Sequence, residues 1–231
     1  MNKQEFYRLE EPRFEQYEFA FYEVADDTEY GDFPKCPKCK SPLGMRRWLP
    51  PRRVYLEQAR RIGDFIFGAG GGDMLVTERF KSSFEKLNLK GIKEFNSVEV
   101  LSIKPKTITR NIPVLFEAVI AIRQSKVLYE KMGVIWTQKP SKNCCEFCGG
   151  GTGKSGEYQS YQKIVLDESS PLDSDIFYAI NFPGSILLSQ KAFEFINEQK
   201  FENAIMTPCS KASLSFELNL PDDAFNDEDE E

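Results

Sequence analysis

Apolar residues follow two different spacings along the chain, and these spacings predict a mixture of strands and helices. Short runs that alternate apolar and polar residues, or that are apolar throughout, predict strands. These runs cover residues 19–24, 97–103, 114–122, 131–137, 163–166 and 213–218. Residues 52–62 are predicted to form a basic helix with Val54, Ala59 and Ile62 facing inward. The pattern as a whole predicts an α+β architecture with mixed to antiparallel sheets.

A succession of strand, cap, helix and turn occurs twice. The two copies cover about residues 63–105 and 175–210. Asp64 and Asp175 stand at the start of the copies. Thr77 and Ser189 stand at the predicted helix starts, where a hydroxyl accepts hydrogen bonds from free amides. Because several features match nearly in register, we predict an internal duplication in which two related strand–helix halves pack together.

The two predicted helices have similar apolar faces and similar ends. The face residues are Phe80, Phe84 and Leu87 in the first copy and Phe193, Phe195 and Ile196 in the second. Gly91 and Asn203 follow the helices and are residue types that readily adopt the left-handed conformation at a helix end. Arg79 and Lys191, near the helix starts, are predicted to face solvent.

Length and composition favour one folded domain. The chain has 231 residues, of which 41% are hydrophobic, and this apolar surface is enough to build a core. We predict a single α+β domain over residues 1–220 and a disordered acidic tail over residues 221–231. No apolar run approaches the roughly 18 residues that cross a bilayer, and the first residues lack the apolar stretch of a secretory signal. These features predict a cytoplasmic protein with no membrane partner.

The net charge of −6 is unevenly distributed. Residues 1–34 and 222–231 are acidic, whereas residues 35–61 are basic. An acidic protein is repelled by phosphate backbones at long range. Nucleic acid is therefore a disfavoured partner, and a basic protein is a favoured one.

Histidine does not occur in the chain. Its lack excludes Ser-His and Cys-His nucleophile pairs, imidazole acid–base catalysis and histidine-ligated metal sites. An enzyme that uses a carboxylate or lysine site stays a minor alternative. The main prediction is a protein that is not an enzyme.

Four of the six cysteines form two Cys-x-x-Cys pairs. The pairs are Cys36 with Cys39 and Cys145 with Cys148. Two intervening residues let a tight turn aim both thiolates at one ion, and two such turns supply four tetrahedral sulfur ligands. In a cytoplasmic chain, such clusters indicate metal or redox chemistry rather than disulfides. The sequence therefore predicts one structural Zn²⁺ ion, shared by a split zinc-ribbon-like pair of knuckles.

The long separation between the pairs leaves other interpretations open. Zinc ribbons usually space their knuckles by about 15–20 residues, whereas here 105 residues separate Cys39 from Cys145. Each pair alone could be a redox dithiol, although Pro37 and Pro42 indicate loop rather than helix. The cysteines could also be metal-free, and Cys144 could replace Cys145. Cys209 is predicted to be a small buried apolar side chain.

Two glycine-rich segments lack parts of the nucleotide-binding motifs that they suggest. Residues 149–155 end in Gly-Lys-Ser, but Cys148 occupies the position of the first P-loop glycine. Residues 68–73 follow a strand-like run, but Asp73 would place a carboxylate beside a pyrophosphate. A second strand-like run then stands where the helix should begin. We predict no nucleotide binding at either segment.

Several short segments together match one known family. They are Cys36-Pro37-Lys38-Cys39, Gly63-Asp64-Phe65, Leu75-Val76-Thr77-Glu78-Arg79-Phe80, Cys145-Glu146-Phe147-Cys148-Gly149, residues 164–170, Asp175-Ile176-Phe177, and Leu187-Leu188-Ser189 with Asn203. Over about residues 30–210 the chain resembles the bacterial double-CXXCG motif family, and it departs at Lys40, where the family has glycine. Members of that family are regarded as immunity proteins of polymorphic toxin systems.

The resemblance implies that the chain neutralises a cognate toxin domain by stoichiometric protein–protein binding. Acids in residues 10–32 and 222–231 are candidates to cover a basic groove on such a toxin. The alternative is a zinc-ribbon nucleic-acid-binding module built on residues 35–61, with Trp48 and Tyr55 as stacking platforms. Its phosphate-binding side chains would be Arg46, Arg47, Arg52, Arg53, Arg60 and Arg61.

Overall fold

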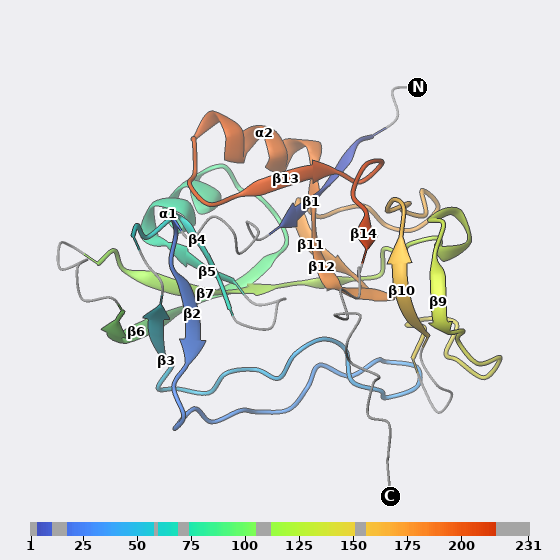
Figure 1. Ribbon diagram of the computed structural model, residues 1–231, viewed down its shortest axis with the longest axis horizontal. Helices are drawn as coiled ribbons and strands as arrows, with labels where there is room; N and C mark the ends of the chain where they lie inside the picture. Colours follow the sequence, from blue (N-terminus) through green and yellow to red (C-terminus); the bar gives the residue numbers. More distant parts are fainter. Residues whose placement is uncertain are drawn as a thin grey trace, which may run out of the picture.

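The computed structural model describes residues 4–10, 18–57, 60–68, 74–104, 112–150 and 156–215. In this part of the chain the fold is mixed α+β and consists mostly of strands (Figure 1). The two α-helices are α1 (Glu78–Lys86) and α2 (Gln190–Glu198), and a short 3-10 helix, η1, covers Tyr129–Lys131. No helix within the described residues is long and apolar enough to cross a membrane. The predicted acidic tail lies outside the described residues.

The first half of the chain forms a six-stranded sheet. Its strands, in spatial order, are β2 (Phe21–Val24), β3 (Arg53–Glu57), β6 (Ile92–Ile103), β7 (Leu115–Ile120), β5 (Met74–Thr77) and β4 (Phe65–Phe67). β3 and β6 are parallel, and the other neighbours are antiparallel. A bridge between Tyr22 and Gly68 joins the two edges, and a Cβ at Gly68 would lie 2.6 Å from the Tyr22 ring. The sheet therefore curls around an apolar core that includes Leu56, Ile66 and Leu75.

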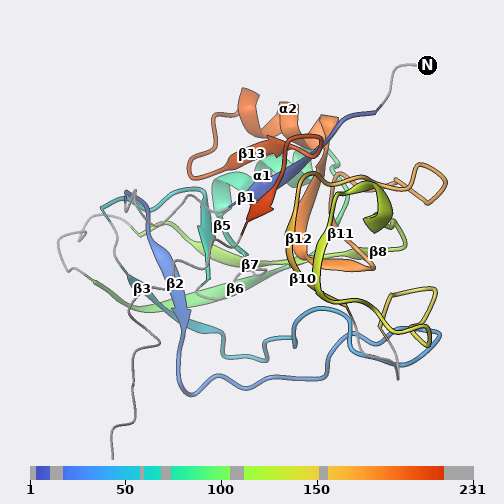
Figure 2. The ribbon, with the colours of Figure 1, turned by 45° about the vertical axis from the view of Figure 1, so that its right-hand side comes forward.

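The second half forms two sheets. The five-stranded sheet has the order β13 (Ile205–Pro208), β1 (Phe6–Glu10), β12 (Phe182–Ser189), β11 (Ile176–Ala179) and β8 (Ile122–Arg123). The three-stranded sheet has the order β14 (Leu214–Ser215), β10 (Glu157–Tyr161) and β9 (Ile135–Gln138). β1 comes from the start of the chain, yet it lies between β12 and β13 (Figures 1 and 2). Residues of both sheets form a second apolar core, which includes Phe177, Phe182 and Leu187.

Four strands and a helix are arranged in the same way in the two halves. The order β6-β7-β5-β4 corresponds to β13-β1-β12-β11, with antiparallel neighbours throughout. α1 directly follows β5, and α2 directly follows β12. Because β1 takes the place that β7 has in the first half, the beginning of the chain completes the sheet of the second half. This likeness is geometric, and the duplication itself stays a prediction.

Asp64, just before β4, organises the start of α1. Its Oδ1 accepts hydrogen bonds from the Thr77 hydroxyl at 2.7 Å and from Arg79 Nε at 3.0 Å. Its Oδ2 accepts a hydrogen bond at 2.9 Å from the backbone amide of Glu202, which follows α2 in the other half. Burial alone would raise the pKa of the Asp64 carboxyl, but the hydrogen bonds from Arg79, Glu202 and Thr77 together lower it.

Asp175, just before β11, makes the matching contacts at the start of α2. Its Oδ1 accepts a hydrogen bond from the Ser189 hydroxyl at 2.8 Å. Its Oδ2 accepts another at 2.8 Å from the backbone amide of Lys90, which follows α1. Lys191 lies 3.9 Å from the same oxygen. Each aspartate therefore holds its own helix start and the loop after the helix of the other half.

The side chains of α1 and α2 pack into one apolar cluster with residues of both halves. Phe80 is fully buried in this cluster. Its ring centroid lies 4.8 Å from that of Phe65, 5.8 Å from that of Phe195 and 5.3 Å from that of Phe201. These separations are typical of favourable aromatic pairs. Phe80 therefore connects α1 to β4 and to the helix and loop of the second half.

The predicted helix starts are confirmed, whereas the predicted helix ends need correction. The hydroxyls of Thr77 and Ser189 each accept a hydrogen bond from the amide three residues further on. The left-handed residues that come soonest after α1 and α2 are Asn88 and Lys200. Gly91 and Asn203 also have positive φ, but they lie further along the connecting loops. A Cβ on Gly91 would lie 1.7 Å from the backbone oxygen of Ile176, so this position requires glycine.

The predicted helix over residues 52–62 is wrong. Residues 53–57 form β3, in which Val54 and Leu56 are fully buried and the intervening residues are half-buried. Two strands, β2 and β6, pair with this segment, and pairing with distant partners overrides a local helical pattern. Leu87 is a second correction, because it is 48% exposed instead of belonging to the buried face of α1.

Most of the predicted strands are confirmed in position. Residues 19–24, 97–103, 114–122 and 131–137 overlap β2, β6, β7 with β8, and β9. Residues 163–166 form no strand, and Leu166 makes only an isolated bridge to Val127. β14 covers two residues of the predicted strand at 213–218, and residues 216–218 lie outside the described part of the chain.

We expect Asp64→Asn to lower the free energy of unfolding by about 2 kcal/mol at neutral pH, because a charged acceptor of several hydrogen bonds is lost. The folded-state pKa of Asp64 is lowered. Its stabilisation is therefore fully present above the ordinary carboxyl pKa and is lost as the pH falls through the folded-state value. Urea unfolding at a series of pH values should show a flatter acid dependence for the variant. Glu85→Gln, at an exposed position of α1, is the control. Equal acid dependence of Asp64→Asn and the natural protein would contradict this role.

Candidate metal centre

The first cysteine pair lies at the tip of an extended arm, residues 25–52, between β2 and β3. The two sides of the arm are joined by a bridge between Tyr30 and Trp48 and by a hydrogen bond of 2.9 Å from the Gly31 amide to the Arg47 oxygen. The arm leaves the six-stranded sheet and runs below the fold toward the three-stranded sheet (Figures 1 and 2). The tip therefore reaches a part of the structure that belongs to the second half.

The backbone around Cys36 and Cys39 forms a tight turn. The Cys36 amide donates to the oxygen of Ser41 at 2.8 Å, and the Lys40 amide donates to the oxygen of Cys36 at 3.0 Å. Lys40 has a φ of 65°, which is the left-handed region. For a residue with a side chain this conformation costs about 1–2 kcal/mol. Lys40 thus adopts a left-handed conformation at the position where the family that the sequence resembles has glycine.

The second pair forms the same turn. The Cys145 amide donates to the oxygen of Gly150 at 2.5 Å, and the Gly149 amide donates to the oxygen of Cys145 at 2.8 Å. Gly149 has a φ of 73° and corresponds to Lys40. The Gly150 amide lies 3.4 Å from Cys148 Sγ and donates to it. The turn therefore directs a backbone dipole at a sulfur, as expected for a thiolate that binds metal.

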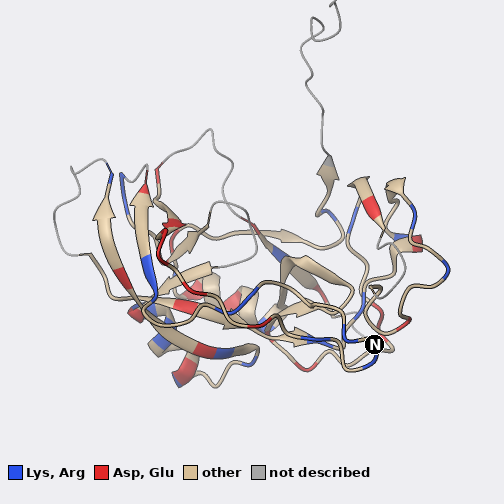
Figure 3. Cartoon of the chain, turned by 90° about the horizontal axis from the view of Figure 1, so that it is seen from below, with Lys and Arg blue, Asp and Glu red and all other residues tan. Residues whose placement is uncertain are grey.

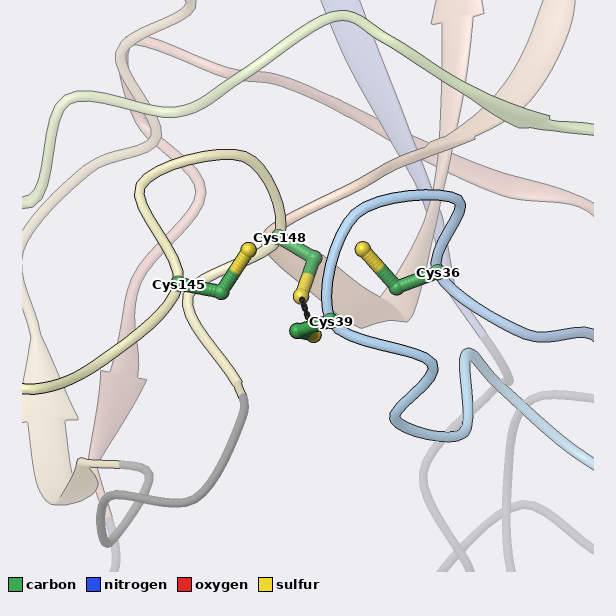
Figure 4. Close-up of side chains that lie close together, drawn as sticks. All are labelled: Cys36, Cys39, Cys145 and Cys148. Atoms are coloured by element: carbon green, nitrogen blue, oxygen red, sulfur yellow. Dashed lines mark hydrogen bonds between the residues drawn. The ribbon is translucent and has the colours of Figure 1, made fainter.

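The structure brings the four predicted cysteines together. The Sγ atoms of Cys36, Cys39, Cys145 and Cys148 all lie within 4.8 Å of one another (Figure 4). The Sγ atoms of Cys39 and Cys148 are 3.5 Å apart. A tetrahedral Zn²⁺ ion with Zn–S bonds of about 2.3 Å places its sulfurs about 3.8 Å apart. The four side chains could therefore hold a metal ion such as zinc after small adjustments.

Burial and hydrogen bonding shift the pKa values of the thiols in opposite directions. Hydrogen bonds from the side chain and backbone of Ser41 lower the pKa of Cys39 to about 6. Burial raises the pKa of Cys148 to about 12. A bound metal ion would outweigh both of these pKa shifts, because coordination deprotonates a thiol outright.

The centre rests on an apolar base. Cys36 and Cys148 are buried, and Ile180, which follows β11, packs with them. Leu43 from the arm and Phe147 from the second loop complete the contact. This packing holds both turns against the second half and limits the access of water to the sulfurs.

Cys144 does not belong to the cluster. Its sulfur lies 3.7 Å from the hydroxyl of Ser141, within the same loop, and the metal-binding group contains Cys145 instead. Within the described residues none of the six cysteines forms a disulfide. Cys209 is buried, as predicted.

Several arginines of the basic segment at residues 35–61 pair with acidic residues. Arg53 lies 2.6 Å from Asp27 and 3.2 Å from Glu99. Arg61 pairs with Glu18 at 2.9 Å and also with Glu202. Acidic and basic residues are interspersed along the same strands and loops (Figure 3). The alternation of acidic and basic runs in the sequence therefore becomes mutual compensation in the fold.

The glycine-rich segments do not acquire nucleotide-binding topology where they are described. β4 and β5 form an antiparallel pair on either side of residues 69–73, instead of the strand and helix of a dinucleotide site. Residues 69–73 and 151–155 themselves lie outside the described part of the chain.

A hollow of about 680 Å³ borders the second cysteine loop and was not predicted from the sequence. Its wall includes the rings of Tyr129, Trp136, Tyr158 and Phe182. The Tyr129 hydroxyl donates to the backbone oxygen of Asn181 at 2.5 Å, and burial raises its pKa. These residues come from separate segments, so no local pattern in the sequence indicated that they would meet.

Comparison with known proteins adds no family assignment. No protein-family model matches the chain, and no curated protein matches it. The resemblance to the double-CXXCG motif family therefore stays a prediction. Function has to be argued from the cysteine cluster and from the charges around it.

Proposed function

We propose that the protein is an immunity protein, which binds and neutralises a cognate bacterial toxin by stoichiometric protein–protein binding. The observation that carries the proposal is the convergence of two Cys-x-x-Cys turns on one cluster, because paired motifs of this kind characterise the family that the sequence resembles. A site of four thiolates is closed, with no open coordination position for a substrate. This donor set supports a stabilising role and a protein that acts by binding.

The metal proposed for the cluster is a structural Zn²⁺ ion on Cys36, Cys39, Cys145 and Cys148. Its position supports a mechanical role. The ion would tie the tip of the arm to the loop between β9 and β10, so that the arm presents one fixed surface. A preformed surface loses less conformational entropy on association, which favours tight binding.

The arm also offers acidic side chains to a basic partner. Asp26, Glu29 and Asp32 are all exposed along it. Exposed acids raise the rate of association with a basic surface and give it specificity. We propose that these three residues face the toxin.

Purification of the tagged protein from its native host tests the function. We expect one partner in stoichiometric amount, matching the C-terminal region of a large secreted protein, and we expect co-expression to suppress the toxicity of that region. Charge reversal at Asp26, Glu29 and Asp32 together should weaken the complex at least about tenfold. Reversal at three exposed acids elsewhere, Glu85, Glu130 and Glu198, is the matched control. Recovery of nucleic acid without a protein partner would contradict the proposal.

The nucleic-acid-binding alternative has weaker support. Arg53 and Arg61 both lie in ion pairs with exposed carboxylates, and a phosphate backbone would have to displace these partners. Arg46 stacks on the ring of Phe33 at 4.9 Å. Three arginines of the basic segment, Arg46, Arg53 and Arg61, are thus already in contact with other side chains of the protein.

We further propose that the two halves arose by duplication. The support is the reciprocity of the two aspartates: Asp64 binds the amide of Glu202, and Asp175 binds the amide of Lys90. The common strand order and the two identical cysteine turns add to it.

A further inference from the structure

A second cavity lies between the arm and the six-stranded sheet. Its volume is about 190 Å³, which is room for on the order of ten waters and hence for a ligand of about ten non-hydrogen atoms. β6 and β7 form its floor, and arm residues 44–49 form its roof. It is distinct from the metal centre, because it contains none of the four cysteines.

An ion pair with little exposure to solvent lines this cavity. Arg52 Nε lies 3.0 Å from Glu117 Oε2, and the two side chains are 17% and 13% exposed. Asn96 Nδ2 donates to the same oxygen at 3.0 Å. Withdrawing two charges from water costs several kcal/mol per ion, and their attraction offsets this only when further hydrogen bonds complete their shells. The shells of this pair are incomplete.

Three observations show the incompleteness. Both contacts of Glu117 converge on Oε2, so they do not use Oε1. Nε of Arg52 makes the closest contact of the ion pair. Nε is buried and has no well-aligned hydrogen bond within the described structure. Burial also raises the pKa of Glu117, although Asn96 and Arg52 both act to lower it. An added cation beside the carboxylate would therefore be favourable.

We propose that this cavity binds a small zwitterion of the α-amino acid class, with its carboxylate at the terminal nitrogens of Arg52 and its ammonium group at Oε1 of Glu117. Such a ligand adds one charge of each sign beside the charge that complements it, and the net charge of the site does not change. A lone anion or a lone cation would leave one member of the pair without a new partner. Guanidinium and carboxylate groups are well suited to these contacts.

The other walls indicate the rest of the ligand. Trp48, Leu49, Ile120 and Tyr178 supply apolar surface to the cavity, which favours an amino acid with an apolar side chain. The charged rim residues Arg46, Arg47 and Glu94 lie at the same cavity and are exposed. The inference is independent of the immunity function, because the cavity contains none of the three acids proposed to face the toxin.

The test is calorimetric titration of the full-length, zinc-supplemented protein with each common amino acid in turn. We expect at least one apolar amino acid to bind. The α-hydroxy acid with the same side chain lacks the ammonium group. It should bind at least about tenfold more weakly, because the loss of one charged contact raises the dissociation constant by about this factor. Glu117→Gln should cause a similar loss. Arg53→Gln is the matched control, because Arg53 is adjacent in sequence but pairs at the surface with Asp27 and Glu99.

A second variant keeps the proposal testable if Glu117→Gln does not fold. Val119→Phe places a larger side chain at the cavity wall on β7 and leaves both members of the ion pair in the sequence, and it should abolish binding while circular dichroism and cooperative unfolding remain native. The inference is overturned if no amino acid binds to the natural protein. It is equally overturned if an amino acid binds but folded Glu117→Gln and Val119→Phe bind it as well as the natural protein does.

Discussion

Replacing Cys36 with serine is expected to release the bound zinc ion and to lower the free energy of unfolding by about 4 kcal/mol. A ligand whose free concentration is about 1,000 times its dissociation constant stabilises the folded state by this amount. Cys36 is the fully buried member of the cluster, so its loss leaves three thiolates and a poorly placed hydroxyl. The arm would then lose its link to the second half. Urea unfolding of variant and natural protein in buffer with the same excess of zinc measures the difference.

Cys144→Ser is the matched control for this prediction. Cys144 neighbours a ligand in the same loop but lies outside the cluster, so its replacement should change stability by no more than about 0.5 kcal/mol and leave the zinc content intact. If Cys36→Ser were as stable as the natural protein in excess zinc, the cluster would not be a structural metal site. If Cys144→Ser lost zinc, the ligand set would be wrong.

The second large effect is expected in the core between the halves. Phe80→Ala should lower the free energy of unfolding by about 3–5 kcal/mol, because a large fully buried ring is lost and a cavity is left behind. The ring packs against Phe65, Phe195 and Phe201. The loss should therefore weaken the contact between the two halves as well as the packing of α1.

Leu87→Ala serves as the comparison within the same region. Leu87 is the C-cap of α1 and is 48% exposed, so its truncation should cost about 0.5 kcal/mol or less. Chemical denaturation of the three proteins gives the values. A loss below about 1 kcal/mol for Phe80→Ala would show that the helices do not pack as the structure describes.

The sequence permitted correct prediction where local chemistry decides the structure. Thr77 and Ser189 cap helices because a hydroxyl followed by a helical pattern is sufficient for the motif. The Cys-x-x-Cys spacing likewise predicted both turns. It also predicted which four cysteines would meet, since tetrahedral coordination requires two such pairs.

Prediction failed where distant partners decide the structure. Residues 53–57 have some helical character, but β2 and β6 make them a strand. The place of β1 between β12 and β13 depends on a segment from the opposite end of the chain. The pairing of Arg53 with Asp27 and Glu99 is equally non-local. Charge runs in the sequence therefore did not indicate which charges would pair with each other.

The cysteine cluster and the Arg52–Glu117 cavity show the same difference between features that local sequence decides and features that distant partners decide. Lys40 stands where the family that the sequence resembles has glycine, yet the backbone there adopts the left-handed conformation that Gly149 adopts in the second turn. No pattern in the sequence indicated the ion pair of Arg52 and Glu117, because one residue precedes β3 and the other lies in β7. The strand order β3-β6-β7 and the course of the arm bring them to one cavity.

The most direct test of the metal centre is X-ray absorption at the zinc edge, combined with metal analysis, on protein purified without added chelator. The structure predicts one zinc ion per chain with four sulfur ligands at about 2.3 Å. Folded protein without zinc, or zinc with nitrogen or oxygen in place of any of the four sulfurs, would contradict the assignment of Cys36, Cys39, Cys145 and Cys148 as its ligands.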